Sequence, residues 1–411
     1  MRGLIGHPLS HSYSPFIHKQ IISKNYDLYD IQEDELKLLL TEKNFECLNV
    51  TIPYKQKVIP YLNELTDISK RLGAINCIKN ENGNLIGHNT DYEGFLWSLH
   101  NNNVNLDNGV IAVLGYGGAS KAIIEAVKTF KNIKLYIVSS SNKKNSITYE
   151  ELYKISSEIT CIINTTPVGM FPNMDDSVID INKFNNVNVL IDIVYNPFRT
   201  KLMIDSINKG VKVVGGIDML VAQAIKAVEF FEDIKIEDSK INEIIKKIVN
   251  KKRNIVLIGM PGAGKTTIAK SLSKIYNLEL IEIDYLIEKD IEMSIKDYFV
   301  LYGEGKFREK EKEIIKSLQD KTNCVISCGG GVVKNIENIN SLRKNGLIIF
   351  LDRDIEKISL SKNRPLTQNK NDLIKLYEER MSLYNNYSDI IIDNNQTTKK
   401  AIEKIKKEIG L

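Results

Sequence analysis

The chain has 411 residues, of which 43% are apolar and 26% are charged, and its 56 basic and 52 acidic residues leave a formal net charge of +4. This composition is close to the average of soluble domains and excludes a disordered chain, while so balanced a charge gives no basis for a nucleic-acid surface. Compact domains cluster at roughly 100–200 residues, so we expect two or three of them.

The cysteines and the N-terminal segment narrow the setting of the protein. Five cysteines are present, and their odd number and lack of CxxC spacing argue against a disulfide framework and against a zinc site. The N-terminal MRGLIGHPLSHSYSP has no apolar signal core, and no apolar run approaches the roughly 18 residues of a membrane span. We therefore expect a cytoplasmic protein that binds small molecules rather than nucleic acid or membrane; its oligomeric state stays open.

Short apolar runs alternate with helix-length amphipathic segments along the whole chain, which predicts an α/β fold with mainly parallel sheets. The predicted strands cover residues 48–52, 110–114, 134–138, 161–164, 189–194, 254–258, 324–327 and 347–351. The strands at 110–114 and 254–258 run into glycine-rich turns, so two mononucleotide-type folds are expected. An amphipathic helix at 241–250 and a charged connection at 251–253 place the boundary between them near residue 250.

The first glycine-rich turn, GYGGASKA at 115–122, indicates a dinucleotide only weakly, because Ser120 replaces the third glycine of G-x-G-x-x-G. Further motifs surround it: HSYSPFIH (11–18), NVTIPYK (49–55), GAIN (73–76), GHNTDYEGF (87–95), INTTPVGM (163–170), DIVYNP (192–197) and GIDMLVAQA (216–224). In this order they resemble the shikimate dehydrogenase family over about residues 1–250. The resemblance implies NADPH-dependent reduction of 3-dehydroshikimate in a cleft between a substrate domain (residues 1–100 plus 216–250) and a Rossmann nucleotide domain (101–215).

Carbonyl reduction builds an alkoxide that needs a proton and a nearby cation, and Lys55 can supply both. Asp91 in the HNTD turn is the candidate carboxylate for positioning that ammonium group. Taken singly, Lys55 could be a surface lysine and Asp91 a helix N-cap. Together, in these two motifs, they are predicted to be catalytic.

The resemblance also implies a set of substrate ligands. Ser12 and Ser14 would bind the substrate carboxylate, although Ser14 could instead be an N-cap before Pro15. Thr51, Asn76 and Gln223 would bind hydroxyl groups, and Tyr195 would line the pocket. The mechanism needs none of the five histidines, which are expected to be structural.

The segment after the second Rossmann strand, 139–144, carries no acid, which disfavours NAD because Asp or Glu usually binds its ribose 2′-hydroxyl. The family's N-R-T/S-x-x-R clamp for the 2′-phosphate has Ser140 at its first arginine, and only Lys144 matches the second in charge. We predict NADP(H), with NAD and a preference for quinate as the alternative. The predicted cofactor residues are Gly115, Gly117, Gly118, Ala119, Ser120, Ser140, Lys144, Thr165 and Gly216.

The second glycine-rich turn, GMPGAGKTT, follows a predicted strand and opens a predicted helix. In such a loop the backbone N–H groups cradle phosphates, Lys265 reaches the β- and γ-phosphates, and Thr266 can ligate Mg²⁺. ATP is therefore predicted as a ligand. The predicted ATP-binding residues in the loop are Gly259, Gly262, Ala263, Gly264, Lys265, Thr266 and Thr267.

Four later stretches fit a site for the phosphoryl acceptor: EIDYLIE (282–288), GEGKFREKE (303–311), SCGGG (327–331) and YEERMSLYNNYSD (377–389), with NRPL (363–366) between the last two. They resemble shikimate kinase, which implies a P-loop domain over residues 251–411. By this resemblance Asp284 contacts the hydroxyl to be phosphorylated, although it could also be a helix N-cap. Arg308 and Arg380 would clamp the substrate carboxylate, and Arg364 would reach ATP from a lid near 363–370. Gly329, Gly330 and Gly331 would let the backbone approach the substrate.

One position departs from the kinase pattern. The family reads D-x-D where this chain has Glu282-Ile283-Asp284, and the longer glutamate could hold Mg²⁺ through water. Thr266 and Glu282 are the predicted metal ligands. We therefore expect a bifunctional enzyme that makes shikimate and phosphorylates it to shikimate 3-phosphate. A nucleotide-sensing module without turnover is the alternative for the second half.

Overall fold

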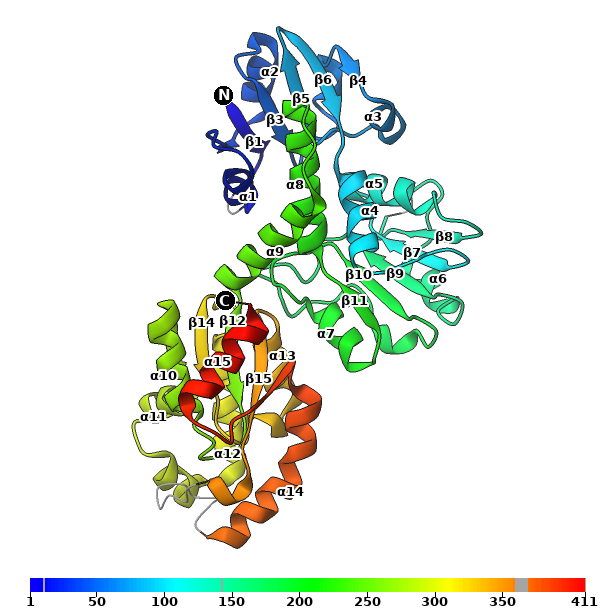
Figure 1. Ribbon diagram of the computed structural model, residues 1–411. Helices are drawn as coiled ribbons and strands as arrows, with labels where there is room; N and C mark the ends of the chain where they lie inside the picture. The colour runs from blue at the N-terminus through cyan, green and yellow to red at the C-terminus, as the bar shows by residue number, and fades with distance from the viewer. Residues whose placement is uncertain (10–11, 142, 359–368, 411) are drawn as a thin grey trace. The chain divides into compact units, whose positions relative to one another are not determined.

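The computed structural model describes residues 1–9, 12–141, 143–358 and 369–410 and divides into two compact units, Met1–Lys247 and Ile248–Leu411 (Figure 1). Helix α9 (Asp238–Lys252) includes Lys251 and Lys252, so most of the connection predicted at 251–253 is helical. Within the described ranges, no helix is long and apolar enough to cross a bilayer.

The first sheet of the N-terminal unit has six strands in the order β2-β1-β3-β5-β6-β4. The strands are β1 (Arg2–Gly6), β2 (Asp27–Asp30), β3 (Cys47–Val50), β4 (Glu64–Leu65), β5 (Cys77–Glu81) and β6 (Asn84–His88). Most strand pairs of this sheet are parallel, as predicted, but β5 is antiparallel to β3 and to β6. The cause is the turn Asn82-Gly83, where both φ angles are positive (54° and 88°), as a two-residue hairpin requires.

Helices α1 (Ser14–Ile21), α2 (Glu33–Glu42) and α3 (Asp67–Leu72) and the 3₁₀ turn η1 (Ile59–Tyr61) accompany this sheet. Helix α2 buries Leu36 and Leu40 in the same cluster as Ile5, Leu48 and Ile78 of the strands. Strand β3 ends at Val50 rather than at the predicted residue 52, since Pro53, which has no N–H for a ladder bond, follows shortly afterwards.

The second sheet of this unit is fully parallel, in the order β11-β10-β9-β7-β8. Its strands are β7 (Val110–Leu114), β8 (Lys134–Val138), β9 (Cys161–Asn164), β10 (Val189–Asp192) and β11 (Lys212–Val214). The accompanying helices are α4 (Asp91–Asn101), α5 (Gly118–Val127), α6 (Tyr149–Lys154), α7 (Lys201–Asn208), α8 (Gly216–Glu232) and the 3₁₀ turn η2 (Ile181–Lys183). Ile111 and Val113 join one apolar cluster and Ala112 and Leu114 another, so both faces of β7 are covered.

The C-terminal unit contains one parallel sheet in the order β13-β14-β12-β15-β16. Its strands are β12 (Asn254–Ile258), β13 (Glu279–Glu282), β14 (Cys324–Ser327), β15 (Gly346–Asp352) and β16 (Ile390–Asp393). Its helices are α10 (Lys265–Tyr276), α11 (Ile283–Ile291), α12 (Ile295–Ser317), α13 (Ile336–Arg343), α14 (Lys370–Tyr387) and α15 (Thr398–Ile409), with 3₁₀ turns η3 (Val332–Lys334) and η4 (Ile355–Lys357). All eight strands predicted from apolar runs are present among these sixteen.

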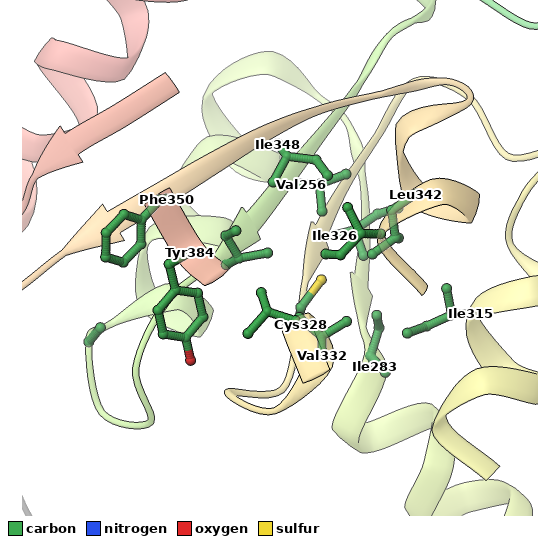
Figure 2. Packing of buried hydrophobic residues seen from close by; sticks show 14 of the residues in the cluster. Val256, Ile283, Ile315, Ile326, Cys328, Val332, Leu342, Ile348, Phe350 and Tyr384 are labelled. Carbon is green, nitrogen blue, oxygen red and sulfur yellow. The ribbon is translucent and has the colours of Figure 1, made fainter. Parts of the chain in front are cut away.

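The core of the C-terminal unit supports its glycine-rich SCGGG segment (Figure 2). Cys328 and Val332, on either side of the three glycines, are buried in the same cluster as Phe350 and Tyr384. The rings of Phe350 and Tyr384 stack with centroids 5.0 Å apart. The Tyr384 hydroxyl donates a hydrogen bond to the Gly330 carbonyl oxygen, so the core fixes the backbone of the triple glycine directly.

Candidate active sites

A cavity of about 190 Å³ in the N-terminal unit brings together side chains that are distant in sequence. They come from the start of α1, the segment after β3, the start of α4, the segment after β10, and α8. Its lining includes all eight side chains predicted to bind the dehydrogenase substrate: Ser12, Ser14, Thr51, Lys55, Asn76, Asp91, Tyr195 and Gln223.

The two predicted catalytic residues of this unit form an ion pair in the cavity. Lys55 Nζ lies 2.5 Å from Asp91 Oδ2, and their side chains are only 15% and 9% exposed. Asp91 is in the first turn of α4, where the helix dipole favours a negative charge. The N-cap of α4 is Thr90, so Asp91 does not have the capping role that was its alternative. The structure therefore holds a cation and a carboxylate together at the cavity wall.

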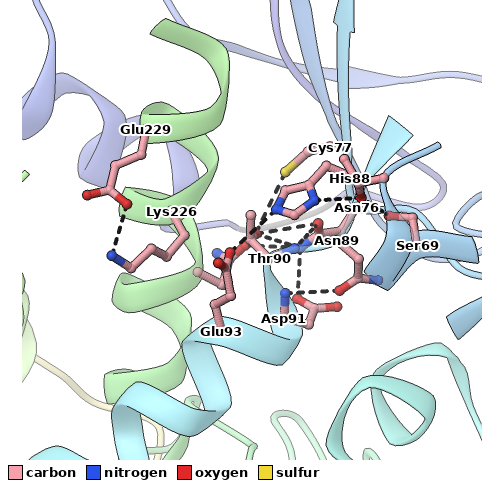
Figure 3. A network of polar contacts seen from close by, with 12 residues as sticks. Ser69, Asn76, Cys77, His88, Asn89, Thr90, Asp91, Glu93, Lys226 and Glu229 are labelled. Carbon is pink, nitrogen blue, oxygen red and sulfur yellow. Dashed lines mark hydrogen bonds and ion pairs between the residues drawn. The ribbon is translucent and has the colours of Figure 1, made fainter. Parts of the chain in front are cut away.

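Asn76 connects this ion pair to the start of α4 (Figure 3). Its Nδ2 donates to Asp91 Oδ1 at 2.9 Å and to Thr90 Oγ1 at 3.0 Å, while its Oδ1 accepts from the Thr90 backbone N–H at 2.8 Å. Asn89 Oδ1 accepts from the Asp91 backbone N–H at 3.0 Å. Asn76 thus holds the Asp91 carboxylate by the oxygen that Lys55 does not contact, and Asn89 holds the Asp91 backbone.

Hydroxyl groups supply further polar atoms in the lining. Ser12 Oγ donates to Ser14 Oγ at 3.0 Å and accepts from the Ser14 backbone N–H at 3.1 Å. Ser14 is the first residue of α1, and Tyr13 is the N-cap of that helix, so Ser14 is not the cap. The Tyr13 and Tyr195 rings lie 5.6 Å apart, and burial raises the pKa of Tyr195. These hydroxyls stay uncharged around neutral pH and act as neutral hydrogen-bonding groups.

A larger cavity of about 380 Å³ lies in the C-terminal unit. It joins the P-loop to the residues predicted to bind the phosphoryl acceptor. The predicted residues in its lining are Gly262, Gly264, Lys265, Thr266, Thr267, Asp284, Arg308, Gly329, Gly330, Gly331 and Arg380. Lys265 Nζ donates to the carbonyl oxygens of Gly259 and Met260, at 2.8 and 3.0 Å.

The two arginines of this cavity differ in how their donors are used. Arg308 pairs with Glu304 at 3.0 Å and with Glu311 at 2.8 Å. Arg380 is 1% exposed and donates from Nη1 to the Gly330 carbonyl oxygen at 3.0 Å, but its Nε and Nη2 are buried without a hydrogen-bond partner. Buried donors are rarely left unsatisfied, so this guanidinium is suited to an anionic ligand.

Asp284 lies beside the first residue of the triple glycine, Gly329. A Cβ built on Gly329 would lie 2.8 Å from Asp284 Oδ1, so a side chain there would crowd the carboxylate. Burial raises the pKa of Asp284, while the Lys265 ammonium acts in the opposite direction. The N-cap of α11 is Glu282, so Asp284 is not the cap.

Family comparisons match one family model to each of the two compact units. The model of the shikimate dehydrogenase substrate binding domain matches residues 4–78, and the shikimate kinase model matches residues 261–410. The shikimate dehydrogenase (NADP(+)) of Clostridium beijerinckii is 42% identical over 253 residues, which cover 57% of this chain and 93% of the relative. The chain belongs to the shikimate dehydrogenase family. A shikimate kinase domain follows in the same chain.

Solved structures give the same result for the dehydrogenase part. Shikimate dehydrogenase 1 from Peptoclostridium difficile matches with a TM-score of 0.56 and 35% identity, covering 60% of this chain and 98% of that one. A quinate dehydrogenase from Corynebacterium glutamicum in complex with NAD matches with a TM-score of 0.53 and 26% identity, covering 59% of this chain and 96% of that one. Proteins named as shikimate dehydrogenase and as quinate dehydrogenase therefore share this fold.

The glycine-rich turn of the dehydrogenase requires a glycine at position 115. Gly115 has a φ of +110°, and a Cβ there would lie 2.6 Å from Thr165 Oγ1. Ser120, which replaces the third glycine, is buried and donates from Oγ to the Gly115 carbonyl oxygen at 2.9 Å. Its hydroxyl is thus satisfied within the turn. Ala119 and Gly216 of the predicted cofactor set also line the substrate cavity.

The predicted 2′-phosphate residues lie apart from that cavity. Ser140 and Lys144 are exposed on the segment after β8, and neither lines it. The Lys144 carbonyl oxygen accepts from Tyr116 Oη at 3.3 Å, which ties this segment to the glycine turn. Gly117 and Gly118 belong to the same turn, at the N-terminus of α5.

The metal prediction for the kinase fits the structure only in part. Glu282 pairs with Lys270 of α10 at 3.1 Å and does not line the kinase cavity. Thr266 Oγ1 does line it and lies 3.4 Å from Ser327 Oγ. Among the described residues, no cluster of three or more His, Cys, Asp or Glu could hold a metal. Arg364 and most of the predicted lid fall outside the described residues.

Residues that sequence reasoning missed line both cavities. His18, treated as structural, and Asn49 line the dehydrogenase cavity. Glu311 lines the kinase cavity, and burial raises its pKa. The sequence motifs could have indicated two of these residues, because Asn49 is the first residue of NVTIPYK and Glu311 is the last residue of the F-R-x-x-E stretch. His18 carried no comparable signal.

Proposed function

We propose that the chain catalyses two consecutive reactions: NADPH-dependent reduction of 3-dehydroshikimate to shikimate, and ATP-dependent phosphorylation of shikimate to shikimate 3-phosphate. The observation that carries the proposal is that each unit has its own cavity with a full set of reactive groups. The first holds the Lys55–Asp91 pair. The second holds Lys265, Asp284 and Arg380.

In the dehydrogenase, the bound nicotinamide cofactor supplies the hydride. Lys55 donates a proton to the developing alkoxide and stabilises its negative charge, while Asp91 keeps the ammonium group in place. Asn76 holds Asp91 from the other carboxylate oxygen. Ser12 and Ser14 are assigned to the substrate carboxylate, and Thr51 and Gln223 to its hydroxyls, because polar lining groups discriminate against analogues that leave them unpaired.

The cofactor assignment is NADP(H). The segment 139–144 has no acid to take a ribose 2′-hydroxyl, and Lys144 offers a cation for the 2′-phosphate. Initial rates with NADP⁺ and NAD⁺, each with shikimate and with quinate, test this assignment. A higher kcat/KM for quinate with NAD⁺ would replace it with the alternative.

In the kinase, Asp284 accepts a hydrogen bond from the acceptor hydroxyl and orients it, with its carboxylate as the proton acceptor. Arg380 and Arg308 bind the substrate carboxylate, and Arg380 has two buried donors available for it. Lys265 stabilises the charge on the transferred phosphoryl group. Asp284, Arg308 and Arg380, which are assigned to the acceptor, would have no use in a module that only senses nucleotide.

Mg²⁺ is expected to reach the kinase together with ATP. The Thr266 hydroxyl lines the cavity and fits a metal ligand, whereas the Glu282 carboxylate is already paired with Lys270. When bound, Mg²⁺ neutralises phosphate charge. Thr266, rather than Glu282, is therefore the proposed protein ligand.

A coupled assay tests the whole proposal. Purified protein supplied with 3-dehydroshikimate, NADPH and ATP should oxidise NADPH and form ADP, with shikimate 3-phosphate as the final product. Binding of ATP without ADP formation in the presence of shikimate would favour the nucleotide-sensing alternative.

Arg380→Met should raise the KM for shikimate in the kinase reaction by about 10- to 100-fold, the size expected for losing charge-assisted hydrogen bonds. The fold should tolerate the change, because methionine removes two buried nitrogens that make no hydrogen bond, and the Gly330 carbonyl oxygen that loses Nη1 still accepts from Tyr384. Steady-state kinetics and thermal unfolding measure the two effects. Lys375→Ala, an exposed change on the same helix, is the control. An unchanged KM for Arg380→Met would remove this arginine from the substrate site.

As the pH is lowered, the kinase should begin to lose activity at a pH above the usual pKa of an aspartate side chain. Burial raises the pKa of Asp284, so its reactive carboxylate is protonated as pH falls through that raised value. The profile of kcat/KM for shikimate against pH measures this loss. The pKa of Glu311 is also raised by burial, and Glu311→Gln separates the two groups. Full activity down to the pKa of free aspartate would contradict the prediction.

A further inference from the structure

Tyr26, which has no part in the proposed chemistry, is buried behind the dehydrogenase cavity together with His18 and Asn49. The three side chains are 9%, 1% and 6% exposed, and His18 and Asn49 line the cavity. The rings of His18 and Tyr26 stack with centroids 3.7 Å apart and an interplanar angle of 14°. Burial lowers the pKa of His18 to about 3, so this stack is uncharged.

The side-chain amide of Asn49 is held at both ends. Tyr26 Oη donates to Asn49 Oδ1 at 2.8 Å, and Asn49 Nδ2 donates to the Asn76 carbonyl oxygen at 3.2 Å. Asn49 Nδ2 also lies 3.3 Å from Cys77 Sγ. The backbone carbonyl oxygen of Asn76 can only accept, so it selects the amide orientation in which Nδ2 faces it, and the Tyr26 hydroxyl then holds Oδ1 at the other end of the amide.

Asn76, whose backbone carbonyl oxygen accepts from Asn49, also holds the Lys55–Asp91 pair through its side chain. The side chain of Asn76 binds Asp91, and Asp91 binds Lys55. The backbone N–H of Asp91 also donates a hydrogen bond to Asn89 Oδ1. A substitution at Tyr26 should therefore displace Asn49 in the cavity lining more than it displaces the Lys55–Asp91 pair.

We propose that Tyr26 is a positioning residue of the dehydrogenase: its hydroxyl holds the Asn49 amide in place, and through it the part of the cavity wall that receives the substrate. This inference rests on the proposed reduction of 3-dehydroshikimate. It assigns Tyr26 a role in substrate binding, not in the chemical step.

Tyr26→Phe keeps the ring and its stacking on His18 but removes the donor. The KM for shikimate in the dehydrogenase reaction with NADP⁺ should rise about fivefold, the size of one net hydrogen bond, with kcat within about twofold of wild type. The matched control is Tyr54→Phe, because Tyr54 is also buried in this unit and donates from Oη to the Ile31 carbonyl oxygen at 2.6 Å. It does not line the cavity and should leave KM unchanged.

A double-mutant cycle with Asn49→Ala tests whether Tyr26 acts through Asn49. In the Asn49→Ala background, Tyr26→Phe should have no further effect on the KM for shikimate in the dehydrogenase reaction. Additive effects, an unchanged KM for Tyr26→Phe, or equal KM changes for Tyr26→Phe and Tyr54→Phe would each overturn the inference. A wild-type protein that does not turn over shikimate would instead overturn the proposed function. Phosphorylation measured on the same samples serves as a reference for intact protein.

Discussion

Lys265→Ala is expected to lower kcat for shikimate phosphorylation by about 10²- to 10³-fold, the usual loss when a preorganised electrostatic group is removed. The side chain of Lys265 is 8% exposed, and it lines the cavity shared by the P-loop and Asp284. Alanine leaves the loop backbone and its N–H groups in place, so weak ATP binding should persist. ADP release with shikimate and ATP measures the effect.

The same Lys265→Ala protein should reduce 3-dehydroshikimate at the wild-type rate, since the dehydrogenase cavity lies in the other compact unit. Lys274→Ala is a matched control, because Lys274 is an exposed lysine on the same helix, α10. A kinase rate that Lys265→Ala leaves intact would show that Lys265 is not needed for phosphoryl transfer. Equal losses in both activities would point to a folding defect.

Much of the fold could be predicted from the sequence because the buried parallel strands are short continuous apolar runs. The strands at 110–114 and 254–258 were found with the bounds that the structure gives them. The antiparallel strand pairs of the first sheet were not predicted, although Asn82-Gly83 is a strong hairpin signal. Strand β13 carries glutamates at both ends and only two apolar residues between them, too little for the pattern to mark it.

The candidate sites were predictable where a motif carries its own chemistry. Lys55 and Asp91 were paired from the reaction's need for a proton and a positioned cation, and the structure places them 2.5 Å apart. The contacts of Glu282 with Lys270 and of Tyr26 with Asn49 were not predictable. Each joins residues from different segments, and only the folded packing decides which polar side chains meet.

Lys55→Ala is expected to lower kcat for the reduction of 3-dehydroshikimate by about 10²- to 10⁴-fold, the range for losing a general acid–base group. Alanine removes both the proton donor and the cation near the alkoxide, and it leaves Asp91 as an unpaired carboxylate that is 9% exposed at the side chain. NADPH oxidation measures the loss. ADP formation from shikimate and ATP on the same sample should be unchanged.

Lys57→Ala is the matched control for Lys55→Ala, because it removes a lysine two residues away whose side chain is 44% exposed and paired with Glu33 at 2.5 Å. A surface pair of this kind contributes about 0–1 kcal/mol to stability, so both activities should stay near wild type. A second comparison separates charge from proton transfer: Lys55→Arg retains a cation but is a poor proton donor, since guanidinium stays protonated. If Lys55→Arg keeps most of the rate, Lys55 acts through its charge alone, and the proton must come from another group in the cavity.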